Sequence, residues 1–121
     1  MATLLVNTGR AIVTNRILGS GTQPNYIGWG TGAGTTGATD TTLFTEVLPR
    51  VSGTGSQVTT STTNDTYQVV GTQTASTSET ITNAGLFDAS TSGNLFVKGD
   101  FTGIALNSGD SIAFTFKVQF S

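Results

Sequence analysis

Hydrophobic and polar residues alternate most regularly close to the end of the chain. Within residues 111–120, every second position is apolar: Ile112, Phe114, Phe116, Val118 and Phe120. A period of two residues is typical of a strand that buries one face and exposes the other. The pattern therefore predicts a half-buried β-strand over this segment.

A second alternating segment lies just before it. Leu95, Val97, Gly99 and Phe101 share one face, and Phe96, Lys98 and Asp100 share the other. The connection 102–110 ends in Asn107-Ser108-Gly109-Asp110, residue types that favour turns. We expect a strand over about 95–101 followed by this connection.

Further strands are expected at about 50–61, 65–75 and 79–87, with turn-forming residues between them, and a short one at Tyr26 to Trp29. Short strands without helices between them favour antiparallel packing over parallel βαβ units. The sequence predicts a mainly β fold, a single antiparallel β-sandwich or jelly-roll-like domain over residues 1–121.

The N-terminal segment departs from this pattern. The apolar residues of Asn7 to Leu18 do not alternate, Thr8 could cap a helix, and Gly19 could close it. We expect one short helix there, with residues 1–6 as an extended arm.

A glycine-rich stretch at residues 28–40 predicts a loop. Gly30-Thr31-Gly32-Ala33-Gly34 partly matches a phosphate-binding motif. However, the P-loop needs Lys-Ser/Thr after its last glycine, and the dinucleotide motif needs a helix that opens there. Neither follows, so we expect a loop that covers the sheet edge or a neighbouring subunit.

Several classes of chemistry are excluded because the chain has no Cys and no His. Disulfides, zinc fingers and the usual nucleophile–histidine sites all need these residues. The seven carboxylates are spread singly along the chain, without a calcium-binding run or a close pair for glycoside hydrolysis. Four of them suit turns, where they accept hydrogen bonds from nearby amides: Asp40, Asp65, Asp88 and Asp110. We expect no enzyme activity, no metal and no cofactor.

The charge content argues against nucleic-acid and membrane partners. Five Lys and Arg residues are too few and too scattered to neutralise phosphates. The sequence has no long apolar run, and its start lacks the cationic flank of a signal peptide. We expect a protein that is made and used without export through a membrane.

Hydroxyl side chains take the place of charges. The chain has 25 Thr and 11 Ser, while only 10% of its residues are charged. Because neutral polar faces lose water at low cost and still form hydrogen bonds, they suit extensive contact with other protein chains. The composition indicates a component of a permanent assembly.

Four phrases of the sequence strengthen this interpretation: Pro24 to Gly32, Asp40 to Glu46, Ile81 to Asp88 and Asn94 to Lys98. They resemble a group of small virion proteins of tailed bacteriophages, over nearly the whole chain from about Asn7. The resemblance implies a β-sandwich or jelly roll, often assembled as a homotrimer, without a catalytic residue. It covers both capsid decoration (cement) proteins and tail-fibre modules.

Capsid decoration is the function we expect, because the chain carries its own Met1 and shows no fibre shaft or repeat. The protein would bind the major capsid protein and copies of itself on the outer capsid surface of the virion. A host-recognition module of the tail is the alternative, and a neck component is a third. In the tail alternative, Trp29 and the 31–40 loop would contact a surface glycan; otherwise Trp29 is a core aromatic.

An interface is expected at the chain start, on the glycine-rich loop and at three arginines, because arginine pairs with carboxylates through its planar fork. The candidate residues are Thr3, Leu4, Leu5, Arg10, Arg16, Trp29, Thr31, Gly32, Thr35 and Arg50.

Overall fold

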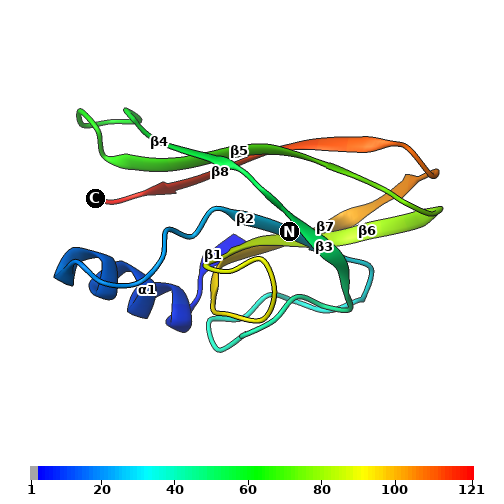
Figure 1. Ribbon diagram of the computed structural model, residues 1–121, viewed down its shortest axis with the longest axis horizontal. Helices are drawn as coiled ribbons and strands as arrows, with labels where there is room; N and C mark the ends of the chain where they lie inside the picture. Colours follow the sequence, from blue (N-terminus) through cyan, green and yellow to red (C-terminus); the bar gives the residue numbers. More distant parts are fainter. Residues whose placement is uncertain (1–2) are drawn as a thin grey trace.

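All strand pairings that the computed structural model describes, over residues 3–121, are antiparallel. They form two sheets that lie face to face (Figure 1). The larger sheet has the order β1 (Thr3–Leu5), β7 (Leu95–Leu106), β6 (Glu79–Phe87), β2 (Tyr26–Gly30), β3 (Glu46–Ser52). The smaller sheet has the order β4 (Thr54–Val58), β5 (Thr66–Thr74), β8 (Ser111–Gln119). The predicted β-sandwich is confirmed.

Strand β8 follows the alternation of its sequence. Its apolar residues are half-buried and the residues between them are exposed. The Phe114 ring stacks on Phe116 at 5.7 Å between centroids and meets the edge of Trp29 at 6.3 Å. Because Trp29 lies on β2, these contacts join the two sheets.

The larger sheet is buried on both faces. Neighbouring residues of a strand point to opposite sides. Leu86 packs with Ile27 and Val69 between the sheets, whereas Phe87 packs with Leu43 on the far side. The far side is covered by the loop before β3, which forms a third layer, while α1 (Asn7–Leu18) lies at one end of the sandwich and packs Ile12 against the core between the sheets (Figure 1).

The chain passes from one sheet to the other at Gly53. The strand expected over 50–61 is therefore wrong as one element, since β3 ends at Ser52 in the larger sheet and β4 begins at Thr54 in the smaller one. A Cβ on Gly53 would lie 2.5 Å from Val69 Cγ1, so the close approach of the sheets requires glycine. Strand β7 also differs from the expectation, because it continues to Leu106 and shortens the connection to residues 107–110.

Helix α1 has the predicted bounds, but its N-terminus is not capped as predicted. Thr8 does not cap it, because its hydroxyl donates instead to the Leu95 carbonyl at 2.6 Å. Gly19 closes the helix as expected, with φ at +94° and its N–H bonded to the Arg16 carbonyl. The Ser20 N–H bonds back to Asn15, which completes a Schellman motif.

The segment expected as an extended arm forms an edge strand. Thr3, Leu4 and Leu5 pair with Gly99, Lys98 and Val97 of β7. Met1 and Ala2 lie outside the described residues. Within those residues, α1 is too short and too polar to cross a membrane as a helix.

Candidate interaction surface

The residues expected to form an interface do not come together in one patch. Thr3, Leu4 and Leu5 lie on β1, at one edge of the larger sheet. Arg10 and Arg16 are exposed on α1, and Thr31, Gly32 and Thr35 belong to the loop after β2. Trp29 and Arg50 point into the protein. The structure therefore distributes these residues over a sheet edge, a helix surface, a loop and two internal positions.

Trp29 is a core residue. Its side chain is 1% exposed and packs with Ala84 and Ile81 between the two sheets. The neighbouring Gly28 and Gly30 do not expose the ring, because a Cβ on Gly28 would lie 2.8 Å from Glu46 Oε2 of β3 and one on Gly30 would collide with the Phe44 carbonyl of the covering loop. The core interpretation holds, and stacking of a glycan on this ring would need the sandwich to open.

Arg50 is held inside the protein. Its side chain is 4% exposed and forms a bidentate pair with Glu46, with N–O distances of 2.7 and 3.0 Å. The same guanidinium donates to the carbonyls of Ala89 and Ser92 and lies 3.4 Å over the Phe87 ring. The expected role as an anchor for a partner is therefore replaced by an internal one, which fastens the 88–94 turn to β3.

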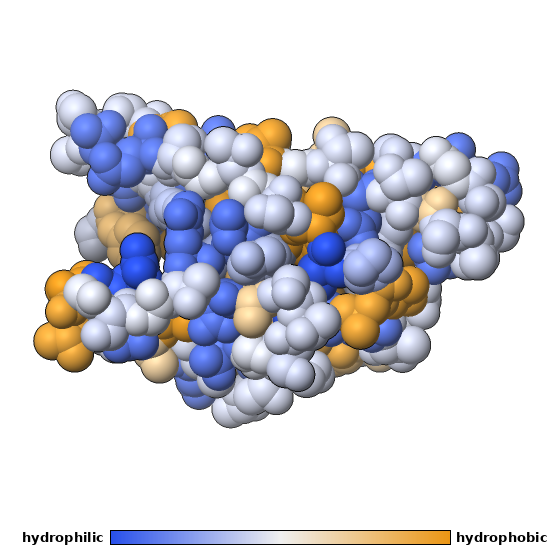
Figure 2. Space-filling view, viewed as in Figure 1, coloured by the Kyte–Doolittle hydropathy of each residue, from blue (hydrophilic) through white to orange (hydrophobic). Residues whose placement is uncertain are grey.

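The end of α1 presents the most exposed apolar side chains of the described residues, Ile17 and Leu18. Figure 2 shows an apolar area at the end of the molecule where α1 lies, besides other apolar areas along the sandwich. Arg16 lies beside them and donates to the Gly21 carbonyl at 2.9 Å. This helix end is a candidate contact region that the sequence did not single out.

The loop after β2 is fixed to the far face of the larger sheet. Thr31 and Gly32 donate their N–H groups to the Thr45 and Phe44 carbonyls. The Asn83 side chain bonds both the N–H and the carbonyl of Phe44, at 3.0 Å each. The loop was expected at the sheet edge or on a neighbouring subunit; it covers the face of the sheet over the inner strands β2 and β6 instead, and residues such as Ala33 and Thr35 stay exposed.

Lys98 of β7 holds this loop in place, a role that sequence reasoning missed. Its side chain is 1% exposed, and Nζ donates to Asp40 Oδ2 and to the Thr42 carbonyl at 2.9 Å each. The ammonium also lies 3.2 Å over the Phe44 ring. The bond from the Gly37 N–H and that from Lys98 lower the pKa of Asp40. The one signal in the sequence was a lysine within an otherwise apolar segment.

The carboxylates expected in turns all accept bonds from nearby amides. Asp88 accepts from Asn94, Asp110 from Asn107, and Asp40 from Gly37. Asp65 accepts from three successive N–H groups, those of Thr60, Ser61 and Thr62, and this lowers its pKa. Among residues 3–121, no three acidic side chains lie close enough together to hold a metal ion.

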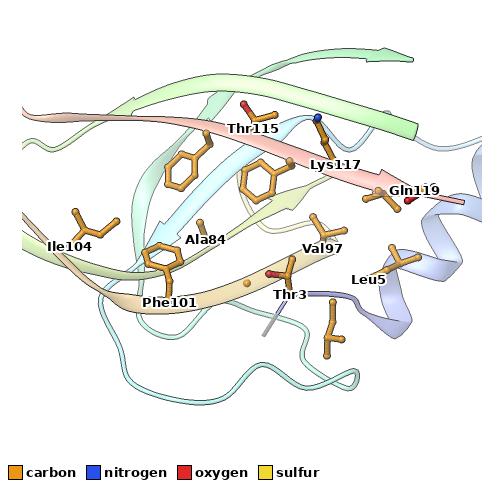
Figure 3. Close-up of a pocket in the computed structure, with 14 residues that line it drawn as sticks. Thr3, Leu5, Ala84, Val97, Phe101, Ile104, Thr115, Lys117 and Gln119 are labelled. Carbon is orange, nitrogen blue, oxygen red and sulfur yellow. The ribbon is translucent and has the colours of Figure 1, made fainter. Parts of the chain in front are cut away.

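One open side of the sandwich carries an apolar groove of ≈ 620 Å³. It lies between β8 of the smaller sheet and β7 and β1 of the larger one (Figure 3). Phe114, Phe116 and Val118 form its upper wall, and Phe101 and Ile104 form its lower wall. Of the expected interface residues, Thr3, Leu4 and Leu5 lie at this groove.

Comparison with protein-family models gives one match, to the family described as "Podophage GP4 fiber I protein gp80", over residues 13–118. This range holds most of the chain. The chain belongs to this family. Comparison with curated proteins and with solved structures gives no match.

Membership of the gp80 family makes this chain a phage virion protein. The matched residues include β2 to β7 in full and most of β8. Both walls of the groove therefore belong to the family domain. Strand β1 and Arg10 precede the match. The expected interface at the chain start is therefore not part of what the gp80 model describes.

Proposed function

We propose that this chain is a structural module of a phage tail fibre. The observation that carries the proposal is the match over residues 13–118 to a family described as a fibre protein. The same match favours the tail alternative over capsid decoration, which the absence of a shaft in the sequence had led us to expect.

The construction of the domain supports a mechanical role. Two charged side chains hold parts of the fold together: Arg50 bonds the 88–94 turn, and Lys98 bonds the loop before β3. The outward side chains of β8 are neutral except for Lys117. Such faces can be covered by other chains at low cost in desolvation. In this proposal the protein acts through protein contacts and does not catalyse a reaction.

The proposed partners are other copies of the chain and other tail proteins. The exposed end of α1, with Ile17 and Leu18, is the surface that we assign to contact with another tail protein, since exposed neighbouring apolar residues favour protein contact. The major capsid protein is the partner in the capsid alternative.

The position of the protein in purified virions tests this proposal. Immunogold labelling with an antibody raised against the isolated chain should mark the tail vertex, and densitometry of virion proteins should give fewer copies than the major capsid protein by a large factor. Label spread over the whole shell, with a copy number comparable to that of the capsid protein, would establish decoration instead.

A second measurement tests whether the helix end attaches the protein to the tail. Particles that carry Ile17→Ser and Leu18→Ser should lose this protein from the tail if the helix end is the attachment surface. Val70→Ser, at another exposed apolar position outside the helix, is the matched control and should leave its occupancy unchanged. Equal occupancy in all particles would remove the helix end from the proposal.

A further inference from the structure

The two sheets of the sandwich differ in width, since the larger one has five strands and the smaller one three. Strand β8 is an edge of the smaller sheet, and its Phe114 packs against Trp29 of β2. Strands β7 and β1 extend past β8 and form the floor of the apolar groove (Figure 3). Over this floor the smaller sheet has no strand.

The floor of the groove is apolar and only partly covered. Val97 and Phe101 face the groove in Figure 3, and Leu4 and Ile104 are 37% and 41% exposed. The apolar side chains of β8 above the floor are half-buried. Apolar side chains placed in the groove would therefore cover surface on both the floor and β8, which favours binding.

The main chain of β8 has groups available for a further strand. The N–H of Phe120 donates to the Asp65 carbonyl, and the Asp110 carbonyl accepts from the Ala75 N–H. The even-numbered residues of β8 therefore direct their main-chain groups toward β5. Because these groups alternate in direction along an antiparallel strand, those of the odd-numbered residues, such as Thr115, point away from β5.

The other sheet edges are less suited to pairing with a further strand. Strand β1 has three residues, β4 has five and contains a glycine, and β3 carries Pro49 beside a register shift. Short strands, prolines and bulges are the usual protection of exposed edges. Strand β8 has nine residues and no proline.

Lys117 is the one charged side chain among the described residues that line the groove. It takes part in neither of the two ion pairs within residues 3–121. Figure 3 shows it pointing away from the floor, on the outer face of β8. A lysine at this position repels a basic residue on a neighbouring strand and attracts an acidic one. The edge therefore favours an acidic partner strand.

We propose that the groove binds one extended segment of another protein, which adds a strand to β8. The segment carries apolar side chains at alternate positions, facing the floor, and an acidic residue opposite Lys117. Main-chain hydrogen bonds to β8 hold the segment, and the groove selects its alternating side chains, as in other cases of strand addition.

The floor limits the occupant to a single strand. A folded domain that paired its own sheet with β8, a second copy of this chain included, would bring a second layer into the space of β7 and β1. A single strand occupies only the layer of β8, about 10 Å above the floor. The partner segment is therefore a loop or a terminus that belongs to no sheet of its own.

A designed nonapeptide tests the groove, with fluorescence anisotropy of the labelled peptide as the measurement. The probe Thr-Val-Glu-Val-Thr-Val-Glu-Val-Thr reads the same from either end. Aligned with residues 111–119, it places a glutamate opposite Lys117 whether it runs parallel or antiparallel to β8. The control peptide Val-Val-Thr-Glu-Thr-Glu-Thr-Val-Val has the same composition without the alternation. The probe should bind the wild-type chain with saturation, and the control peptide at least about tenfold more weakly.

Variants of the full chain locate the binding. Thr115→Pro removes an outward N–H but no bond to β5, and should weaken binding of the probe by about tenfold. Thr115→Ala keeps the N–H and should bind like the wild type. Ile104→Ser, at the groove, should also weaken binding, whereas Val70→Ser, similarly exposed at 43% outside the groove, should not. Lys117→Glu should weaken binding of the probe and strengthen that of a peptide with lysines in place of its glutamates.

Urea unfolding checks that each variant is folded, and Ile104→Ser keeps the test decisive if Thr115→Pro is not. The proposal would be overturned by the absence of saturable binding below about 1 mM probe, by equal binding of the control peptide, or by binding that neither Thr115→Pro nor Ile104→Ser weakens. Self-association of the wild-type chain that Ile104→Ser abolishes would assign the groove to a second copy and overturn it as well. None of these results depends on where the protein lies in the virion.

Discussion

Lys98 Nζ and Asp40 Oδ2 lie 2.9 Å apart and join the centre of β7 to the loop that covers the larger sheet. Lys98 is buried, whereas the Asp40 side chain keeps contact with solvent. The two partners therefore differ in what their loss leaves behind. A lysine without its carboxylate would be a buried charge, but a carboxylate without its lysine could still be hydrated.

We therefore predict that Asp40→Ala is more destabilising than Lys98→Met. Asp40→Ala should lower the free energy of unfolding by about 3 kcal/mol, and Lys98→Met by about 1 kcal/mol, because methionine fills the same space without a charge. Urea unfolding followed by Trp29 fluorescence measures both. The double variant should be more stable than Asp40→Ala alone; a simple sum of the two losses would contradict the coupling.

We predict that lysine cannot replace Arg50 without a loss of stability. Arg50→Lys keeps the charge but loses the bidentate contact with Glu46 and a carbonyl contact in the 88–94 turn. The free energy of unfolding should fall by about 2 kcal/mol. Arg10→Lys, at an exposed position of α1, is the control and should change stability by less than about 0.5 kcal/mol. If both variants unfold alike, the internal role of Arg50 is wrong.

Two glycines at α1 should resist substitution for different reasons. A Cβ on Gly9 would lie 2.0 Å from the Phe96 carbonyl oxygen, so Gly9→Ala should cost about 2–3 kcal/mol although alanine favours helices. Gly19 has open space around it but a φ of +94°, so Gly19→Ala should cost about 1 kcal/mol. Thermal unfolding of the two variants distinguishes the steric cost from the backbone cost. A Gly9→Ala protein as stable as the wild type would show that α1 can move off β7.

Stability should fall in acid through Asp65 and Asp40. The amide bonds that each accepts, and Lys98 at Asp40, hold both carboxyl pKa values below the ordinary 3.8. Because the folded pKa is lower than the unfolded one, the contribution to stability is complete above the ordinary pKa and is lost as pH falls through the folded value. Asp65→Asn should therefore flatten the fall in unfolding free energy below about pH 4. Urea titrations at a series of pH values measure the slope. An unchanged slope would exclude Asp65 as a source of acid sensitivity.

The sequence predicted most of the strands, including β6, which is buried on both faces, but it missed the break at Gly53 and strand β1. Strand β8 was recognised because Phe114 is half-buried and Thr115 is exposed. The break at Gly53 was invisible, because Val51 and Val58 have the same apolar spacing whether they belong to one sheet or two. Strand β1 is too short to show a period.

The roles of the charged residues could not be read from the sequence. Lys98 occupies a position that alternation assigns to the face opposite the core, and on most sandwiches that face is solvent. Here the loop around Asp40 and Phe44 covers it, so the lysine is buried. The pairing of Arg50 with Glu46 follows from four residues of spacing along a strand, where both side chains lie on one face. The sequence does not show that the loop around Asp40 and Phe44 covers this face.

The crossing at Gly53 gives the two sides of the sandwich unequal strength under load. Tension applied to one layer passes into the other through the covalent main chain where β3 continues into β4. On the opposite side, residues 107–110 join β7 to β8 at one end of the groove, and along the rest of the groove the two strands belong to different sheets and share no strand pairing. A load that parts the two layers would therefore open the groove side first, starting at the Gln119 end of β8, which lies farthest along the strand from residues 107–110.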